Sequence, residues 1–208
     1  MKLINDDCMN IMQNYTDNYF DLAIVDPPYG INVFSTGNYK QKRNRWLNDS
    51  EKKITKWNKK PTKKYFNELF RISKNQIIFG GNYFNLPPYR CVIVWDKILN
   101  FESFSAVEIA WTSFNKPASL FKFSIALNNV KVKKLHPTQK PIALYRWILE
   151  NYSKPTDKII DTHLGSGSSA IASHYFGIKE FVGIEIDKEY YNNAVNRIKK
   201  ETMQGKLL

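Results

Sequence analysis

The stretch Ile24-Val25-Asp26-Pro27-Pro28-Tyr29-Gly30 decides how the rest of the chain is interpreted. The apolar run from Leu22 to Val25 predicts a buried strand, and the two prolines after it cannot continue a hydrogen-bond ladder. A sharp turn at Asp26 would place a carboxylate, the Pro27 carbonyl and the Tyr29 ring at the carboxyl end of a strand, where open α/β sheets bind ligands. This set suits the holding of a planar amino group. The alternative is a proline turn that Asp26 merely caps.

Length and composition favour one globular domain. The chain has 208 residues, enough for one well-buried core, so a single domain over residues 1–208 is expected. No apolar stretch approaches the roughly 20 residues of a membrane span, and the first residues lack the apolar core of a signal peptide. We therefore expect a cytoplasmic protein with no membrane contact. Cys8 and Cys91 are the only cysteines, too few for a disulfide framework or a metal cluster, so no metal is expected.

Positive charge is concentrated in one part of the chain. Of the formal net charge of +12, residues 40–64 carry +9, from eleven Lys or Arg and two acidic residues. Such a patch, with Trp46 and Trp57 among the basic residues, is typical of nucleic-acid contact, the alternative being a solvated loop. We expect a basic recognition insertion at about residues 31–64, in which the loop 31–48 becomes ordered on binding. The residues expected to contact nucleic acid are Lys40, Lys42, Arg43, Arg45, Trp46, Lys52, Lys53, Lys59 and Lys60.

Strand and helix patterns alternate along most of the chain, which predicts an α/β fold. The expected strands are 2–5, 22–25, 76–79, 91–95, 106–111, 158–161 and 181–187, with a further short strand at 121–125. One expected helix begins at residue 8, and the other expected helices span 62–72, 142–149, 170–176 and 189–200. The succession of strand, helix and strand over 22–79 predicts a parallel pair, whereas the short link between 91–95 and 106–111 favours an antiparallel pair.

A second candidate site follows the strand that ends at Asp161. The turn Thr162-His163-Leu164-Gly165-Ser166-Gly167-Ser168 leads into a helix, and the next strand reaches Glu185, which is the outline of a nucleotide-binding unit. Glu185 is placed to accept hydrogen bonds from ribose hydroxyls. The turn lacks the third glycine of a dinucleotide site and the lysine of a phosphate-binding loop. The ligand class that remains, with a ribose and no phosphates, is S-adenosylmethionine; a plain βαβ unit is the alternative.

Three separated motifs now resemble one family. Asp26-Pro27-Pro28-Tyr29, His136-Pro137-Thr138-Gln139-Lys140-Pro141 and the turn at 161–168 are similar, in this order, to the motifs of the β-class amino-methylating DNA methyltransferases, particularly small phage or prophage members. In that class the catalytic motif precedes the cofactor motif. The resemblance implies a circularly permuted, Rossmann-like, seven-stranded methyltransferase fold, with a mixed sheet and helices on both faces. It also implies S-adenosylmethionine as cofactor, S-adenosylhomocysteine as product, and a restriction-modification or phage setting.

The resemblance further implies which residues act. The implied catalytic residues are Asp26, Pro27, Pro28 and Tyr29. The implied cofactor-binding residues are Asp7, Cys8, Asp26, Thr138, Lys140, Asp161, His163, Gly165, Ser166, Gly167, Ser168 and Glu185. In this family Asp161 and the two glycines would hold the methionine end of the cofactor, Glu185 the ribose and Asp7 the adenine amino group, and the segment with Thr138 and Lys140 packs beside the methionine moiety. His163 departs from the family, in which many members carry Phe, and a packed side chain is expected there.

The implied reaction is methylation of an exocyclic amino group on double-stranded DNA. The amino nitrogen is a poor nucleophile until Asp26 and the Pro27 carbonyl each accept one of its hydrogens, and the base must first be flipped out, where it would stack on Tyr29. Adenine N6 is the expected target, by analogy with Asp at position 26; cytosine N4 is the alternative. RNA, protein amides and an inactive nucleic-acid-binding module are the other classes considered. A homodimer is expected by analogy.

Overall fold

The computed structural model of the chain describes residues 1–31, 58–98, 105–124 and 139–203. Most of the expected recognition insertion lies outside these residues. The same holds for several expected site residues, namely Lys40, Lys42, Arg43, Arg45, Trp46, Lys52, Lys53 and Thr138.

Eight strands form one mixed sheet in the order β1-β8-β7-β2-β3-β5-β4-β6. The strands are β1 (Lys2–Asn5), β2 (Phe20–Val25), β3 (Ser73–Phe79), β4 (Val92–Asp96), β5 (Val107–Thr112), β6 (Ser119–Lys122), β7 (Lys158–Asp161) and β8 (Glu180–Glu185). The seven-stranded sheet implied by the family resemblance is thus corrected to eight. The eighth strand is β6, which pairs in parallel with β4 and so covers an edge of β4 that would otherwise leave backbone groups unpaired.

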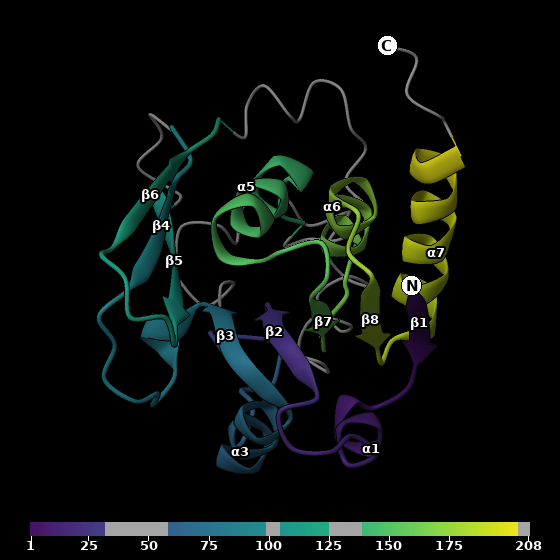
Figure 1. Cartoon of the computed structure of the whole chain (residues 1–208), viewed down its shortest axis with the longest axis horizontal. Coiled ribbons are helices and arrows are strands. Elements are labelled where there is room, and N and C mark those ends of the chain that lie inside the picture. Colours follow the sequence, from purple (N-terminus) through teal and green to yellow (C-terminus); the bar gives the residue numbers. More distant parts are fainter. Residues whose placement is uncertain (32–57, 99–104, 125–138, 204–208) are drawn as a thin grey trace, which may run out of the picture.

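Helices cover both faces of the sheet (Figure 1). The helices are α1 (Cys8–Met12), α3 (Lys63–Ile72), α5 (Ile142–Tyr152), α6 (Ser168–Phe176) and α7 (Lys188–Met203), with the 3-10 helix η1 at Gly81–Tyr83. Residues of β2 alternate between two cores: Leu22 and Ile24 pack with α5, α6 and α7, whereas Ala23 and Val25 pack with α1 and α3. This alternation, with both faces buried, is the reason that β2 reads as a continuous apolar run.

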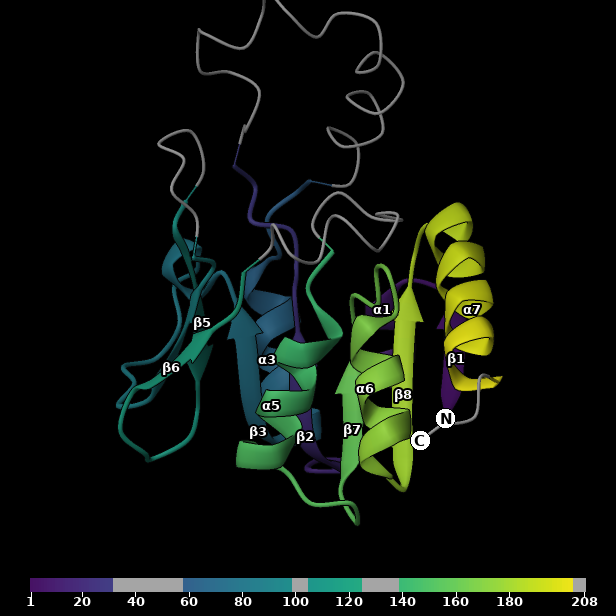
Figure 2. The same ribbon diagram turned by 90° about the horizontal axis from the view of Figure 1, so that it is seen from above.

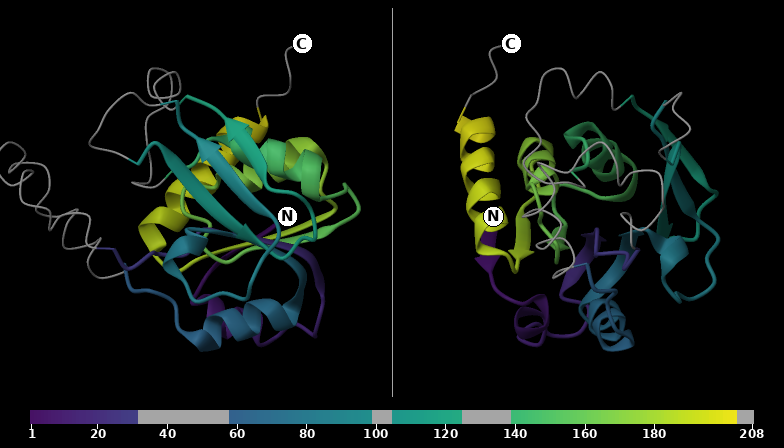
Figure 3. Two further views of the ribbon diagram at one scale, coloured as in Figure 1. Left: turned by 90° about the vertical axis from the view of Figure 1, so that its left-hand side faces the viewer. Right: turned by 180° about the vertical axis from the view of Figure 1, so that it is seen from behind.

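The central strands are parallel, and their arrowheads point to one end of the sheet in Figure 2. β2 is hydrogen-bonded in parallel to β3 on one side and to β7 on the other, with Ala23 opposite Ile160. β5 is antiparallel to β4, as the short link between them predicted, and it is also antiparallel to β3. The left-hand view of Figure 3 shows the teal strands β4 to β6 as one side of the molecule. The catalytic and cofactor motifs, far apart in sequence, therefore lie on adjacent strands.

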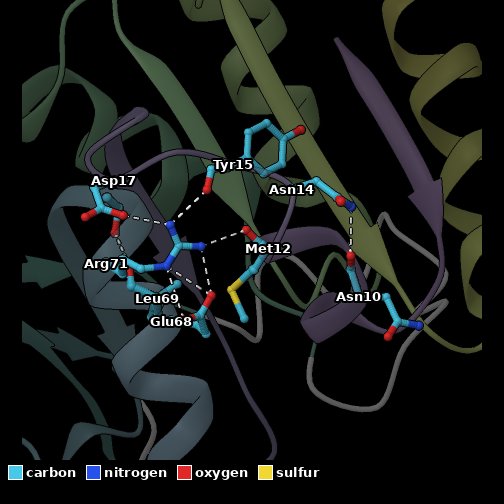
Figure 4. Close-up of polar contacts among 9 residues, drawn as sticks. Asn10, Met12, Asn14, Tyr15, Asp17, Glu68, Leu69 and Arg71 are labelled. Atoms are coloured by element: carbon cyan, nitrogen blue, oxygen red, sulfur yellow. Dashed lines mark hydrogen bonds and ion pairs between the residues drawn. The ribbon is translucent and has the colours of Figure 1, made fainter.

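Arg71, near the end of α3, joins that helix to α1 and the loop after it (Figure 4). Its guanidinium donates to the carbonyls of Met12 and Tyr15 and pairs with the carboxylates of Asp17 and Glu68. Met12 ends α1, and its carbonyl also accepts from Tyr15 N at 3.1 Å, so the arginine adds a second donor at the end of this helix. This clamp fixes α1, and with it the segment that leads into β2.

Several element boundaries differ from the sequence predictions for local reasons. The strand predicted to reach 187 ends at Glu185, because the Asp187 carboxylate accepts from the backbone N–H groups of Glu189 and Tyr190 and caps α7. β6 begins two residues before the predicted start and ends at Lys122. Among the described residues, no helix has the length and apolarity that a membrane crossing requires.

Candidate active site at the carboxyl ends of the central strands

Acidic residues gather at the carboxyl ends of the central strands, because these neighbouring parallel strands end on the same side of the sheet. Asp26 follows β2, Asp161 is the last residue of β7, and Glu185 is the last residue of β8. The three strands are β2, β7 and β8 in spatial order, so the carboxyl groups form a row at the carboxyl ends of adjacent strands. Open α/β sheets bind their ligands outside these strand ends.

The Asp26 carboxylate has a defined set of donors. The Tyr29 hydroxyl donates to Oδ1 at 2.7 Å, and the Lys140 ammonium donates to Oδ2. Burial raises the pKa of Asp26, and the positive charge of Lys140 opposes that effect. A carboxylate offers about four acceptor positions, so two further donors can still be bound. The turn at Asp26 thus holds a carboxylate in place without exhausting its capacity to accept.

Tyr29 is held from two directions. Its ring stacks on that of Tyr83, with centroids 5.0 Å apart and planes at 16°. Gly80, with φ +68, lies against the ring so closely that a Cβ there would come within 2.2 Å of Cε1. One face of Tyr29 is therefore already covered by Tyr83, whose own side chain is 37% exposed. The two rings together form a stacked aromatic pair beside Asp26.

Lys140 lies just before α5 and is buried, and the structure joins it to β2 and β5. Besides Asp26, its ammonium pairs with Glu108 Oε2 at 3.3 Å. Burial by itself lowers the pKa of Lys140, but the two carboxylates raise it above the ordinary value. Glu108 Oε1 in turn pairs with Lys97 at 2.7 Å. Burial acts to raise the pKa of Glu108, and the two lysines hold it below the ordinary value.

Sequence reasoning did not identify Glu108 as a site residue. The signal was present, because Glu108 is the single charged residue in the apolar strand segment Ala106-Val107-Glu108-Ile109-Ala110. A charged residue inside a strand that pairs on both sides needs a buried counter-charge. Its counter-charges are Lys97, directly after β4, and Lys140, just before α5, and the local sequence specifies neither pairing.

The glycine-rich turn after β7 is fixed by hydrogen bonds to acidic side chains. Gly165 N donates to Glu185 Oε2 at 2.9 Å, and Asp187 N donates to Oε1 at 3.0 Å. The Asp161 carboxyl accepts from His163 N and Ser169 Oγ. Burial raises the pKa of Asp161 to about 7, so its charge is sensitive to conditions near neutrality. The turn therefore brings two buried carboxyl groups, Asp161 and Glu185, together at the carboxyl ends of β7 and β8.

Gly167 and Arg197 connect this turn to α7. Gly167 has φ +78, and a Cβ at this position would lie 2.9 Å from Ile198 Cδ1. Arg197 donates to Ser166 O and to Ser168 Oγ, both at 2.9 Å. A glycine is required by both the backbone angle and the close approach of the helix. The expected cofactor residues Ser166, Gly167 and Ser168 thus lie together against α7.

His163 and Cys8 are packed rather than reactive. Burial lowers the pKa of His163 to about 4, and its Nδ1 lies 2.9 Å from Thr162 Oγ1. The ring also meets Tyr65 edge to face at 5.4 Å. Burial raises the pKa of Cys8 to about 12, so its thiol is protonated. Asp7 caps α1, where Oδ1 accepts from Met9 N at 2.8 Å.

Beyond Glu185, an exposed apolar side chain marks the outer part of the edge. Ile186 is 61% exposed directly after the Glu185 carboxylate. Asn5 Nδ2 donates to the carbonyls of both residues, at 2.8 and 3.2 Å, and so fixes this backbone. An exposed apolar side chain next to a carboxylate is suited to a flat, partly polar ligand. Ile186 was also missed from the sequence, where it reads as one more strand residue.

The two ends of the predicted recognition insertion meet beside Tyr29. Gly30 N donates to Asn58 Oδ1 at 3.1 Å, and Asn58 Nδ2 donates to Ile31 O at 2.8 Å. Lys60 lies next to Gly30, and its ammonium is 5.7 Å from the centre of the Phe84 ring. Of the expected DNA-binding residues, Lys59 and Lys60 are within the described part of the chain. The insertion therefore leaves and rejoins the fold at the site.

Comparison with known proteins identifies the family. The family model N6_N4_Mtase, described as a DNA methylase, matches residues 48–196. Type II methyltransferase M.HpaI of Haemophilus parainfluenzae is 24% identical over an alignment 243 positions long, which covers 96% of this chain and 74% of that protein.

Solved structures share the fold over nearly the whole chain. The M1.HpyAVI–SAM complex has a TM-score of 0.60 and 21% identity, covering 94% of this chain and 98% of that one. The PvuII DNA methyltransferase, which is cytosine-N4-specific, also has a TM-score of 0.60, with 14% identity over 97% of this chain and 89% of that one. The methyltransferase fold implied by the three motifs is confirmed. Because the family model spans more than half of the sequence, the chain belongs to the N6/N4 DNA methylase family and is a DNA amino-methyltransferase.

Proposed function

We propose that the chain uses S-adenosylmethionine to methylate the N6 amino group of adenine in double-stranded DNA. The observation that carries this proposal is the Asp26 carboxylate, which lies at the end of β2 with Tyr29 and Lys140 as donors. β2 is the immediate neighbour of β7, and the glycine-rich turn after β7 is hydrogen-bonded to two buried carboxyl groups, Asp161 and Glu185. An amino-group acceptor and a candidate cofactor site are therefore on adjacent strand ends.

The residues at this edge fit S-adenosylmethionine. Ile186 offers an exposed apolar surface for the adenine, and Glu185 has acceptor positions left for ribose hydroxyls after its two backbone bonds. Asp161 is a buried carboxyl group suited to the ammonium of the methionine end, and Asp7 keeps Oδ2 for the adenine amino group. When bound, S-adenosylmethionine supplies an electrophilic methyl group on a sulfonium sulfur. No metal is part of the proposal.

Asp26 and the Pro27 carbonyl would act on the target nitrogen. The lone pair of an exocyclic amino group is delocalised into the base, and two acceptors for its two hydrogens favour a pyramidal nitrogen with the lone pair free. Asp26 can serve as one acceptor because its present donors occupy about half of its capacity. The acceleration would come from positioning and from the negative charge near a nitrogen that becomes cationic. Pro28 fixes the turn that aims both acceptors.

The target base must leave the duplex, at a cost of a few kcal/mol. The stacked pair of Tyr29 and Tyr83 supplies an aromatic surface beside Asp26, and stacking contributes about 1–3 kcal/mol per base. The basic insertion at about 31–64 would hold the phosphates, because its ends meet at Gly30 and Asn58 next to Tyr29. We therefore propose that DNA binds at the carboxyl ends of the central strands, on the side where this insertion leaves the fold.

Cytosine N4 is the second candidate target. The PvuII enzyme is cytosine-N4-specific and has a similar fold, and the site asks only for an amino group. The deciding experiment incubates the purified chain with duplex DNA and labelled S-adenosylmethionine, digests the DNA and identifies the labelled nucleoside. We expect N6-methyladenine; 4-methylcytosine would overturn the choice of base. Absence of S-adenosylmethionine binding in calorimetry would instead favour an inactive nucleic-acid-binding module.

The remaining parts of the proposal concern organisation. We propose that residues 1–208 act as one domain that works in the cytoplasm of a bacterial cell or phage-infected host, and that two copies pair on a duplex. Sedimentation of the chain with and without a short duplex tests the pairing. A mass that stays at one copy in both conditions would contradict it.

A further inference from the structure

We propose that Glu108 is a positioning residue for the methyl-transfer site, acting through Lys140 on Asp26. The inference rests on the proposed use of Asp26 as the acceptor for the target amino group. Glu108 lies on β5, which is separated from β2 by β3 in the sheet. It reaches the site through the buried ammonium of Lys140.

The four side chains form a chain of alternating charge. Lys97 pairs with Glu108 Oε1 at 2.7 Å, Glu108 Oε2 lies 3.3 Å from Lys140 Nζ, and Lys140 donates to Asp26 Oδ2. All are largely buried, with side-chain exposures of 11%, 26%, 3% and 13% along the chain from Lys97 to Asp26. The formal charges sum to zero. In a site of low dielectric, loss of any one member leaves an uncompensated charge.

Glu108 shares Lys140 with Asp26. The Glu108 Oε2 atom is buried and has no well-aligned hydrogen bond among the described residues, so its contact with Lys140 is chiefly coulombic. The ammonium also lies 4.6 Å from the centre of the Phe79 ring, which confines it on another side. Because Lys140 is held between two carboxylates and a ring, it fixes the orientation of Asp26. Its single positive charge is shared between Asp26 and Glu108, so it does not by itself neutralise Asp26 fully.

This sharing matters because positive charge passes through the site. The sulfonium of the methyl donor is cationic, and the target nitrogen becomes cationic as it is methylated. A lone Lys140 beside Asp26 would oppose both charges. Glu108 offsets that lysine, so that the region around Asp26 stays electrostatically neutral and Asp26 keeps its attraction for the amino group. Removal of the Glu108 charge therefore disfavours a cationic ligand more than a neutral one of the same shape.

The test compares two ligands that differ in this charge. Calorimetry measures the affinities of S-adenosylmethionine, a sulfonium, and S-adenosylhomocysteine, an uncharged thioether, for the wild type and for Glu108→Gln. We expect Glu108→Gln to weaken S-adenosylmethionine binding about 5- to 10-fold with little change for S-adenosylhomocysteine. Single-turnover methylation is expected to slow at least about 10-fold at saturating cofactor. Glu108→Asp should recover part of both losses.

Two further variants make the result specific. Glu150→Gln removes the same charge from an exposed pair with Arg146 on α5 and should change neither affinity. Lys97→Met removes the outer cation, makes the four-residue chain net negative, and should shift the ratio of the two affinities in the opposite direction. This sign reversal tests the proposal even if Glu108→Gln folds poorly.

The outcomes separate this inference from the proposed function. Equal weakening of both ligands by Glu108→Gln, or no change, would overturn the positioning role, because a merely structural residue does not distinguish a sulfonium from a thioether. A wild type that binds S-adenosylmethionine but methylates no DNA base would overturn the proposed reaction. In that case the contrast between the two ligands still decides the role of Glu108.

Discussion

The Tyr29 hydroxyl donates to Asp26 Oδ1 at 2.7 Å, while Lys140 donates to the other oxygen of the same carboxylate. The aromatic residue expected to stack on a base thus also orients the acidic residue expected to hold its amino group. The two functions are mechanically linked, because Tyr29 cannot shift without changing the direction of the Asp26 lone pairs.

Asp26→Asn is expected to reduce methyl transfer at least about 100-fold and, because it leaves the charge of Lys140 uncompensated as Glu108→Gln does, to weaken S-adenosylmethionine binding about 5- to 10-fold. The amide keeps the shape of the carboxylate but replaces one acceptor with a donor that faces the incoming amino group. Single-turnover methylation and calorimetry on the same sample measure the two quantities. Retained turnover would show that the amino group is held elsewhere.

Asp26→Ala should also abolish transfer, and should destabilise the fold by about 3 kcal/mol because it removes one counter-ion of buried Lys140.

Gly80→Ala is expected to impair activity through Tyr29. Its Cβ would come within 2.2 Å of the Tyr29 ring, and its φ of +68 is strained for any other residue. Gly177→Ala is the matched control, because Gly177 has φ +83 but nothing within 4 Å of a Cβ. Both variants should lose about 1 kcal/mol of unfolding free energy from backbone strain. Only Gly80→Ala should lose methyl transfer; equal activities would show that the position of Tyr29 is not critical.

Neutralising Lys52, Lys53, Lys59 and Lys60 together is expected to weaken DNA binding and to flatten its dependence on salt. For each lysine that binds a phosphate, its neutralisation should reduce the slope of log K against log salt by about 0.9. Titrations at several salt concentrations, with one duplex and with fluorescence anisotropy as readout, provide the slope. Neutralising the exposed Lys188 and Lys200 on α7 serves as control and should leave the slope as it is. An unchanged slope in the fourfold variant would assign the basic patch to a solvated loop.

Asp161 and His163 are expected to give opposite dependences of stability on pH. The pKa of Asp161 rises from 3.8 to about 7 on folding, so the folded state binds the extra proton and stability falls as pH rises through this window. The pKa of His163 falls from 6.5 to about 4, so the unfolded state binds the extra proton and stability rises with pH in nearly the same window. In the wild type the two slopes largely cancel.

Single variants should expose each slope. His163→Phe should leave a chain whose unfolding free energy decreases from about pH 4 to about pH 7, and Asp161→Asn should leave one whose unfolding free energy increases up to about pH 6.5. Urea unfolding at several pH values measures both. Parallel pH profiles for the two variants would contradict the assignment of these buried groups.

The parts of the fold that local signals determine could be predicted from the sequence. The strand before Asp26, the turn after Asp161 and the antiparallel pair of β4 and β5 all appear where expected, because apolar periodicity and turn residues specify them. The short strand at the edge was displaced by two residues. β6 has only four residues, and its register depends on β4, not on its own pattern.

The contacts that complete the site depend on residues far apart in sequence. Lys140 meets Asp26 across 114 positions, and Glu108 was not expected to take part at all. Tyr83 stacks on Tyr29 because Gly80 turns the chain with a positive φ at the end of β3. None of these pairings has a local signature. The sequence predicts which chemical groups reach the edge, and the fold decides which of them touch.

The pairing of β1 with β8 has a consequence for the timing of synthesis. Asn5 lies opposite Glu185, so β1 must wait for a partner that is made 180 positions later. At about 5–20 residues per second, a ribosome needs roughly 10–40 seconds to deliver that partner. Until then β1 and the acidic end of β8 cannot form their edge of the sheet. The enzyme therefore completes the β1–β8 side of the sheet, with Glu185, late in synthesis. A chain interrupted before that point contains the Asp26 turn but lacks β8.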